Sequence, residues 1–389
     1  MIKVSTKFGF VRKKTGKDTA FWSIKYQKHI IKCYSSPQAK QQGGLLLFYT
    51  PKVSYMIRFA IIGHGNIGSR HAHHIEQHPE AELVAVCDKN PAQLARYAAD
   101  KVFTTTDFNA ILDRNDIDVV NVCLPNYLHA PCTIAALEKG KHVVCEKPMA
   151  MSVSECSAMI HAAEVHNKQL FVVKQNRYNP PVQAVKQLVE QGALGAIYQV
   201  QINCFWNRNE RYYTQSDWRG SRSKDGGCLF TQCSHFVDIM YYLIGNVLPI
   251  KGLVHNFGHE GFVEFEDSGA FILQAANNGA LVSFCFSTCT HQKNMEGSIT
   301  IIAEHGTVKI GGQYLNTIEY QNIANHHIIL PDTGNSCNDY GEYQGSMSNH
   351  DKVIQNVVDT LLQRDTVATN GQEGRQIVAI IEGMYGVVG

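Results

Sequence analysis

Between residues 56 and 176, short apolar runs alternate with segments that carry apolar side chains at helical spacing. The runs have the length of buried strands: Phe59–Ile62, Leu83–Cys87, Val102–Thr105, Asp118–Leu124, His142–Cys145 and Leu170–Lys174. Strands that alternate with helices predict an α/β domain with a doubly wound, mostly parallel sheet. Ligands bind such a sheet at the carboxyl ends of its strands.

The pattern changes after residue 176. A helix is expected over Pro181–Gln191, then a long strand over Ile197–Trp206, a polar and aromatic loop, and a helix over Gly227–Ile244. Strand-like runs follow at Leu253–Asn256, Gly261–Phe265, Ala270–Gln274, Leu281–Ser287, Ser298–Ala303 and Thr307–Ile310, with a hairpin turn at Asn277–Gly279. We therefore predict an α+β domain over 177–389 with a large, mainly antiparallel open sheet, whose C-terminal helix returns to the first domain.

The sequence from Gly63 to Gly68 fits the pattern G-x-G-x-x-G and lies between the first predicted strand and a helix. In this context the glycines allow a tight turn, close approach of a pyrophosphate, and close packing of helix on strand. The second strand ends on Asp88, 20 residues after Gly68, where a carboxylate can bind a ribose 2′-hydroxyl. Residues 56–176 are therefore predicted to form a dinucleotide-binding Rossmann domain, and Asp88 favours NAD over NADP.

Residues 1–55 form a basic extension, with 11 Lys/Arg and one acid, whereas the remainder holds 24 basic and 33 acidic residues. A basic leader is typical of a nucleic-acid arm or a transit peptide. This leader lacks an apolar stretch typical of a signal peptide and has no amphipathic period. We favour the interpretation that it is disordered or precedes a natural start at Met56.

Twelve cysteines are scattered along the chain without a C-x-x-C pair. Such cysteines are typical of small buried side chains in a reducing compartment, so no structural zinc site and no other metal site is predicted. The chain has no apolar run of membrane-spanning length. We expect a cytoplasmic protein without a membrane partner.

Lys147 follows a predicted strand directly, between Glu146 and Pro148. An amine at this edge lies where the nicotinamide of a bound dinucleotide is expected, and desolvation beside a positive ring favours its neutral form. A neutral amine can accept the proton of a hydroxyl. His235 lies in the helix predicted after Gly227, and on one helix it would share a face with Thr231 and Asp238. The other histidines, including His71, are assigned no role.

The glycine turn, Asp88, the Glu146-Lys147-Pro148 run and the helix bearing His235 together resemble the Gfo/Idh/MocA family of NAD(P)-dependent sugar oxidoreductases. The resemblance implies that Lys147 and His235 are catalytic. With the strand ends, it gives these predicted cofactor contacts: Gly63, Gly65, Asn66, Ile67, Gly68, Asp88, Leu124, Pro125, Asn126, His129, Glu146, Lys147, Gln175, Trp218 and Arg219. Many members of the family have an aspartate where this chain has Thr231.

The strings Thr231–Phe236 and Asn176–Pro180 are similar to the branch that oxidises UDP-N-acetylglucosaminuronic acid at the third sugar carbon, for bacterial surface polysaccharides and lipopolysaccharide. The resemblance implies that a nucleotide sugar is the partner and that NAD is the cofactor. Predicted substrate contacts are Lys147, Arg177, Tyr178, Asn179, Thr231 and His235, and we expect Arg177 to bind an anion. The loop 207–222 adds four arginines and three aromatic side chains suited to a charged nucleotide sugar.

Three alternatives stay open: a dehydrogenase of another sugar or cyclitol, an inactive dinucleotide-sensing protein, and a nucleic-acid binder through the basic leader. A sensor would need neither Lys147 nor His235, and we predict no nucleic-acid partner. The broad second sheet predicts a homo-oligomer, a dimer or a tetramer, because a large apolar face tends to find a partner. Whether Lys147 or His235 is the base stays undecided.

Deletion of residues 1–55 should leave the folding and the activity of the protein intact, because the predicted core begins after Met56. Circular dichroism and an activity assay of the truncated chain would check this. Loss of either property would refute the interpretation that these residues precede the natural start.

Overall fold

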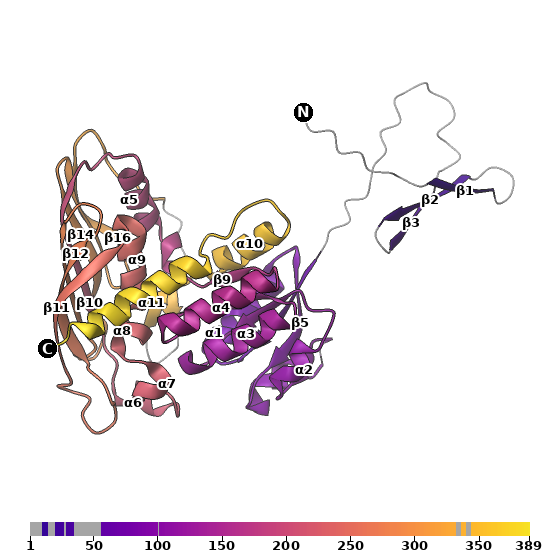
Figure 1. Cartoon of the computed structure of the whole chain (residues 1–389), viewed down its shortest axis with the longest axis horizontal. Helices are drawn as coiled ribbons and strands as arrows, with labels where there is room; N and C mark the ends of the chain where they lie inside the picture. The colour runs from indigo at the N-terminus through magenta and orange to yellow at the C-terminus, as the bar shows by residue number, and fades with distance from the viewer. Residues whose placement is uncertain are drawn as a thin grey trace. The chain divides into compact units, whose positions relative to one another are not determined.

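Six parallel strands form the first sheet, which confirms the predicted doubly wound architecture (Figure 1). In the order of the sheet they are β6 (Phe103–Thr105), β5 (Ala81–Cys87), β4 (Ile57–Ile62), β7 (Val119–Val122), β8 (His142–Cys145) and β9 (Leu170–Val172). Central strand β4 is buried almost throughout. Continuous apolar strands are expected where helices cover both faces of a parallel sheet.

The computed structural model describes residues 10–14, 20–26, 29–34, 56–99, 101–331, 336–339 and 344–389. The chain divides into two compact units, residues 1–54 and residues 55–389. In the first unit, β1 (Phe10–Lys14), β2 (Ala20–Tyr26) and β3 (His29–Tyr34) pair as an antiparallel sheet. The other residues of the extension lie outside the described residues, and its proposed disorder or non-native origin stays a prediction.

Helices connect the strands of the first sheet. They are α1 (Asn66–Gln77), α2 (Phe108–Leu112), α3 (His129–Glu138) and α4 (Val153–Val165), with short 3₁₀ segments η2 (Pro91–Tyr97), η3 (Asn126–Leu128) and η4 (Gln175–Tyr178). The start of α4 is fixed by Ser152, whose hydroxyl accepts a hydrogen bond from the Glu155 backbone N–H at 3.2 Å. A side-chain cap of this kind satisfies one of the unpaired N–H groups at a helix start.

A seven-stranded sheet forms the core of the second half, mainly antiparallel as predicted. Its order is β11 (Val247–His255), β12 (Ser268–Ala275), β13 (Leu281–Ser287), β10 (Ile197–Phe205), β14 (Glu296–Ala303), β15 (Gly306–Gly311) and β16 (Thr317–Ile323). Only the β10–β13 pair among these is parallel. Two further strands, β17 (Cys337–Asp339) and β18 (Gln344–Met347), pair with each other.

Helices of the second half lie on one side of this sheet and continue onto the first (Figure 1). They are α5 (Pro180–Glu190), α6 (Glu210–Thr214), α7 (Arg222–Asp225), α8 (Cys228–Thr231), α9 (Ser234–Ile244), α10 (His350–Leu361) and α11 (Gly371–Gly386). Helix α11 contacts both α4 and β11, and α10 contacts α1. None of the helices in the described residues is long and apolar enough to cross a membrane.

Three local predictions were wrong. Residues 227–244 form two helices rather than one, because the Cys233 N–H bonds the carbonyl of Cys228, five residues back, which widens the turn between them. Gly261–Phe265 forms turns and bends instead of a strand, and β16 was not predicted. The helix expected from Pro91 is the 3₁₀ segment η2.

Candidate active site

A cleft of about 170 Å³ opens at the carboxyl edge of the parallel sheet, between it and helices of the second half. It collects most of the predicted side chains: Ile67, Leu124, Asn126, His129, Glu146, Lys147, Gln175, Trp218, Arg219, Thr231 and His235. It also contains residues that the sequence did not single out: Trp206, Arg208, Tyr212, Gln232, Asn338, Gly345, Ser346 and His350. Segments up to 280 residues apart in the chain therefore meet at one edge.

The turn from Gly63 to Gly68 fits a dinucleotide. Gly63 has φ +93°, and a Cβ there would lie 2.3 Å from the carbonyl oxygen of Cys123. A Cβ on Gly68 would lie 1.9 Å from the Gly63 carbonyl oxygen, whereas one on Gly65 would meet no protein atom within 4 Å. Gly65 caps α1 without a side-chain hydrogen bond, so the first N–H groups of the helix can bind phosphate oxygens.

Asp88 lies beside this turn, half-buried at the end of β5. Its two carboxylate oxygens accept hydrogen bonds from the backbone N–H groups of His64 at 2.7 Å and Asn90 at 2.8 Å. These bonds fix the carboxylate and leave lone pairs for a ribose hydroxyl. Lys89, the neighbour that weakened the preference for NAD, forms an exposed ion pair with Asp217 at 3.6 Å.

Lys147 reaches the cleft from the end of β8, and its Nζ donates a hydrogen bond to the carbonyl of Thr231 at 3.1 Å. Burial lowers the pKa of this amine to about 8; the nearby charges of Lys174 and Arg208 also lower it, while Glu146 and Asp225 oppose the shift. An ordinary lysine has a pKa near 10.4. A far larger fraction of Lys147 is therefore neutral near pH 7 to 8 than of a surface lysine.

His235 also lines the cleft, from the first turn of α9. Burial, followed by the charges of Lys147 and Lys174, lowers its pKa well below the usual value. The imidazole is thus neutral at physiological pH and can both donate and accept a hydrogen bond. Thr231 lies on α8, so the predicted shared helical face of Thr231, His235 and Asp238 was wrong.

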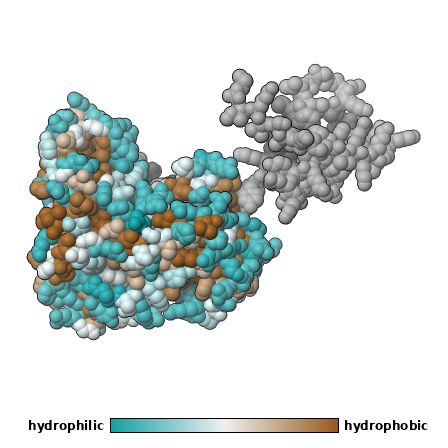
Figure 2. Space-filling model, in the orientation of Figure 1, coloured by the Kyte–Doolittle hydropathy of each residue, from teal (hydrophilic) through white to brown (hydrophobic). Residues whose placement is uncertain are grey.

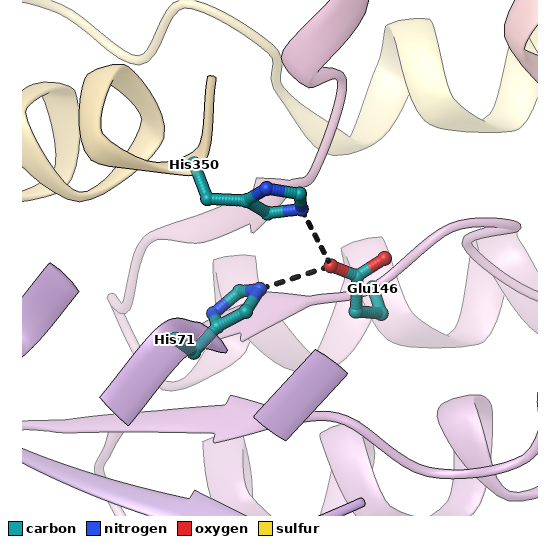
Figure 3. A group of neighbouring side chains, drawn as sticks. All are labelled: His71, Glu146 and His350. Carbon is teal, nitrogen blue, oxygen red and sulfur yellow. Dashed lines mark hydrogen bonds and ion pairs between the residues drawn. The ribbon is translucent and has the colours of Figure 1, made fainter. Parts of the chain in front are cut away.

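Glu146 is held by two histidines that received no role in the sequence prediction (Figure 3). Its Oε1 lies 2.9 Å from Nε2 of His71 and 3.6 Å from Nε2 of His350. Burial raises the pKa of Glu146, but the hydrogen bonds of His350 and His71 outweigh this and hold it well below its usual range. Glu146 is therefore an ionised carboxylate at the base of the cleft.

The donor atoms of His71, Glu146 and His350 lie within 4.8 Å of one another, as do those of His259, Asp267 and Cys289. Nδ1 of His71 accepts from Asn121 Nδ2 at 2.8 Å, so its Nε2–H can donate to Glu146 without an ion between them. The prediction that the chain holds no metal stays a prediction.

Three predicted substrate contacts are engaged elsewhere, and their assignment is corrected here. The Arg177 guanidinium pairs with Asp238 at 2.7 Å and with Glu373 at 2.7 Å. Asn179 donates to the carbonyl of Tyr314 at 3.0 Å, and Tyr178 packs against apolar side chains. The described residues that line the cleft do not include these three, so Arg177 joins η4, α9 and α11 rather than binding a ligand.

Arg208 and Arg219 bring positive charge to the second half of the cleft. The Arg208 guanidinium lies 5.0 Å from the Trp206 ring and donates from Nε to Gln232 Oε1 at 2.8 Å. Arg219 lies 4.4 Å from the Tyr212 ring. Planar guanidinium groups of this kind pair bidentately with carboxylates and phosphates. The sequence contained these arginines but could not tell which ones face the cleft.

Comparisons with known proteins agree with this geometry. The family model described as "Oxidoreductase family, NAD-binding Rossmann fold" matches residues 57–174, and the "GFO/IDH/MocA C-terminal domain" matches residues 182–309. The chain belongs to the Gfo/Idh/MocA oxidoreductase family. Its N-terminal domain is accordingly an NAD-binding Rossmann fold, which confirms the predicted cofactor.

Solved structures of Gfo/Idh/MocA proteins include two WlbA dehydrogenases crystallised in complex with NADH and UDP-GlcNAcA. The protein from Chromobacterium violaceum is 34% identical with a TM-score of 0.77, over 85% of this chain and 93% of that one. The protein from Bordetella pertussis is also 34% identical with a TM-score of 0.76, over 85% of this chain and 96% of that one.

A levoglucosan dehydrogenase from Pseudarthrobacter phenanthrenivorans is 33% identical over 172 residues, which is 43% of this chain and 44% of that protein. An uncharacterised oxidoreductase of Streptococcus pneumoniae is 28% identical over 53% of this chain and 55% of that protein. The chain thus spans about half the length of these curated relatives.

The glycine turn gives a test that separates folding from cofactor binding. Gly65→Ala should fold with an unchanged melting temperature but bind NADH on the order of tenfold more weakly, because the methyl group enters the space of the pyrophosphate. Gly68→Ala should lower the melting temperature, since its Cβ meets the Gly63 carbonyl. Thermal melts and NADH fluorescence titrations would check both.

Gly386→Ala is the matched control, because a Cβ there also meets no atom within 4 Å but lies at the end of α11. It should change neither property for the worse. If Gly65→Ala bound NADH as the wild type does, the assignment of this turn to the pyrophosphate would be wrong.

Proposed function

We propose that this protein is an NAD-dependent dehydrogenase of a sugar CH–OH group, and that its substrate is UDP-N-acetylglucosaminuronic acid, oxidised at the third sugar carbon. The observation that carries the proposal is the Lys147 amine, whose pKa of about 8 leaves part of it neutral in a cleft that also holds His235. The WlbA structures with NADH and UDP-GlcNAcA support the choice of substrate. A role in surface polysaccharide synthesis follows from that choice.

In this proposal Lys147 accepts the proton of the sugar hydroxyl. Bound NAD supplies the hydride acceptor, so the alcohol carbon loses a hydride and the oxygen loses a proton. Neutral His235 lies in the same cleft and can hydrogen-bond the same hydroxyl oxygen. Ionised Glu146 lies beside Lys147 and favours the ammonium that forms when the proton arrives.

The arginines of the cleft account for an acidic, phosphorylated substrate. Arg208 and Arg219 replace Arg177 as the proposed contacts for the carboxylate and the diphosphate, because they line the cleft. The rings of Trp206, Tyr212 and Trp218 lie in the same cleft and can cover a sugar or a uracil. A substrate without an anionic group would leave these guanidinium groups without a counterion.

The second candidate is a dehydrogenase of an uncharged sugar. The match to levoglucosan dehydrogenase at 33% identity favours it. That match extends over 43% of this chain, whereas the likeness to the WlbA structures extends over 85%. An uncharged substrate also gives no role to Arg208 and Arg219.

We further propose that the protein forms a homo-oligomer through the outer face of the seven-stranded sheet. This face exposes apolar side chains over six strands, and apolar surface gathers over this sheet in Figure 2: Leu248, Leu253, Ile272, Leu281, Ile302 and Tyr320. A broad apolar sheet face suits a second copy of the same face. Leu253→Glu combined with Ile272→Glu should reduce the mass in light scattering, and Ile329→Glu should not; unchanged mass in both would contradict the assignment.

A substrate panel tests the proposed activity. The full chain would be incubated with NAD and UDP-sugar acids, UDP-N-acetylglucosamine, levoglucosan or free polyols, while reduced nicotinamide is followed by absorbance and keto sugars by mass spectrometry. We expect turnover of the UDP-N-acetylated uronic acid alone. Turnover of levoglucosan or a polyol in its place would favour the second candidate.

Lys147→Met should lower kcat by about a hundred- to ten-thousandfold, because the proton acceptor is lost, while NADH still binds. Lys147→Arg is the control that keeps the charge but cannot become neutral, and it should be equally inactive. Retained turnover in either variant would refute the role of Lys147.

A further inference from the structure

Lys147 is held by a turn of the second half of the chain. Its Nζ donates to the carbonyl of Thr231, the last residue of α8, at 3.1 Å. Because the carbonyl has no charge of its own, this bond directs the amine without neutralising it. The position of Lys147 thus depends on what fixes Thr231.

Asp225 fixes Thr231. It ends α7 and is fully buried, and its Oδ1 accepts a hydrogen bond from the Thr231 hydroxyl. Its Oδ2 accepts from the Gly220 backbone N–H at 2.8 Å. Asn126, from η3 of the first domain, donates from Nδ2 to the Asp225 carbonyl at 2.7 Å and to the Thr231 hydroxyl at 3.1 Å. The carboxyl group therefore joins both halves of the cleft beneath the amine.

The charges around the two groups differ in sign. Around Lys147 lie two anions and two cations: Glu146, Asp225, Lys174 and Arg208. Around Asp225 lie Arg219, Lys147 and Glu266. Burial raises the pKa of Asp225 to about 7, with the Gly220 hydrogen bond, Arg219 and Lys147 opposing the shift. The amine and the carboxyl group therefore titrate in neighbouring pH ranges, and each affects the other.

We propose that Asp225 is a positioning residue for Lys147: through Thr231 it holds the amine toward the cleft, and its negative charge sets the pH at which the amine releases its proton. This inference rests on the proposed function, in which Lys147 is the proton acceptor. Asp225 does not line the cleft among the described residues, so it acts through Thr231 and through its field. An ionised Asp225 stabilises the ammonium that forms as the sugar is oxidised.

The sign of the effect follows from the charges. Ionised Asp225 raises the pKa of Lys147, so its removal lowers the pH at which the amine becomes neutral. The pH profile of kcat/KM for oxidation rises as Lys147 loses its proton, and Asp225→Asn should move this rise to lower pH. A loss of packing alone would lower the height of the profile and leave its midpoint in place.

The test is a titration of Lys147 itself. The full chain, labelled with ¹³C at the lysine Cε, is titrated by NMR, and the Lys147 signal is identified by its absence in Lys147→Arg. In Asp225→Asn we expect the midpoint to fall by about one pH unit, the usual effect of losing a nearby opposite charge. Thr231→Val removes one donor from the carboxylate and should give a smaller fall; Thr231→Ser keeps the hydroxyl and should restore the wild-type midpoint.

An unchanged midpoint in folded Asp225→Asn would overturn the proposal, and so would equal midpoints in Thr231→Val and Thr231→Ser should Asp225→Asn fail to fold. The titration needs no substrate. If no sugar of the panel were oxidised, the proposed function would fail while the shift of the Lys147 midpoint would still decide the role of Asp225.

Discussion

The partial burial of one amine governs the arrangement of this protein. Lys147 sits at the end of a parallel strand, where the sheet meets the second half of the chain, and burial lowers the pKa of its amine to about 8. A fully solvated lysine would stay charged and could not accept a proton at neutral pH. The fold must therefore keep water from the amine while it leaves one side open to a ligand.

Buried ion pairs keep the two halves in register around that amine. Arg177 joins Asp238 of α9 to Glu373 of α11, and Lys174 lies 3.9 Å from the same Asp238 carboxylate. Each ion alone would be costly to bury, and breaking such a pair leaves an uncompensated charge. Glu146 is satisfied in the same manner by His71 and His350, which come from opposite ends of the described chain. These contacts explain why α10 and α11 return to the first domain.

Local sequence patterns were enough to predict the architecture. The alternation of strands and helices, the glycine turn and Asp88 all lie within one βαβ unit, where spacing along the chain fixes spacing in the structure. Lys147 could be placed because a strand end fixes the edge on which its neighbour lies. The cleft therefore contained most of the predicted cofactor contacts.

Contacts between distant segments could not be predicted in this way. Arg177 looked like an anion site because nothing in its neighbourhood shows that Asp238 and Glu373 meet it. The break between α8 and α9 depends on one widened turn, which leaves no mark on the apolar pattern. Asp225 and His350 act through partners about 100 to 280 residues away, and periodicity carries no information at that range.

The most direct measurement of the central claim is a crystal structure of the full chain with NADH and UDP-N-acetylglucosaminuronic acid. The account predicts that the Lys147 Nζ lies within hydrogen-bonding distance of the oxygen on the third sugar carbon, with that carbon facing the nicotinamide and His235 beside the same oxygen. A sugar bound with another carbon facing the nicotinamide, or with Lys147 directed away from it, would contradict the account.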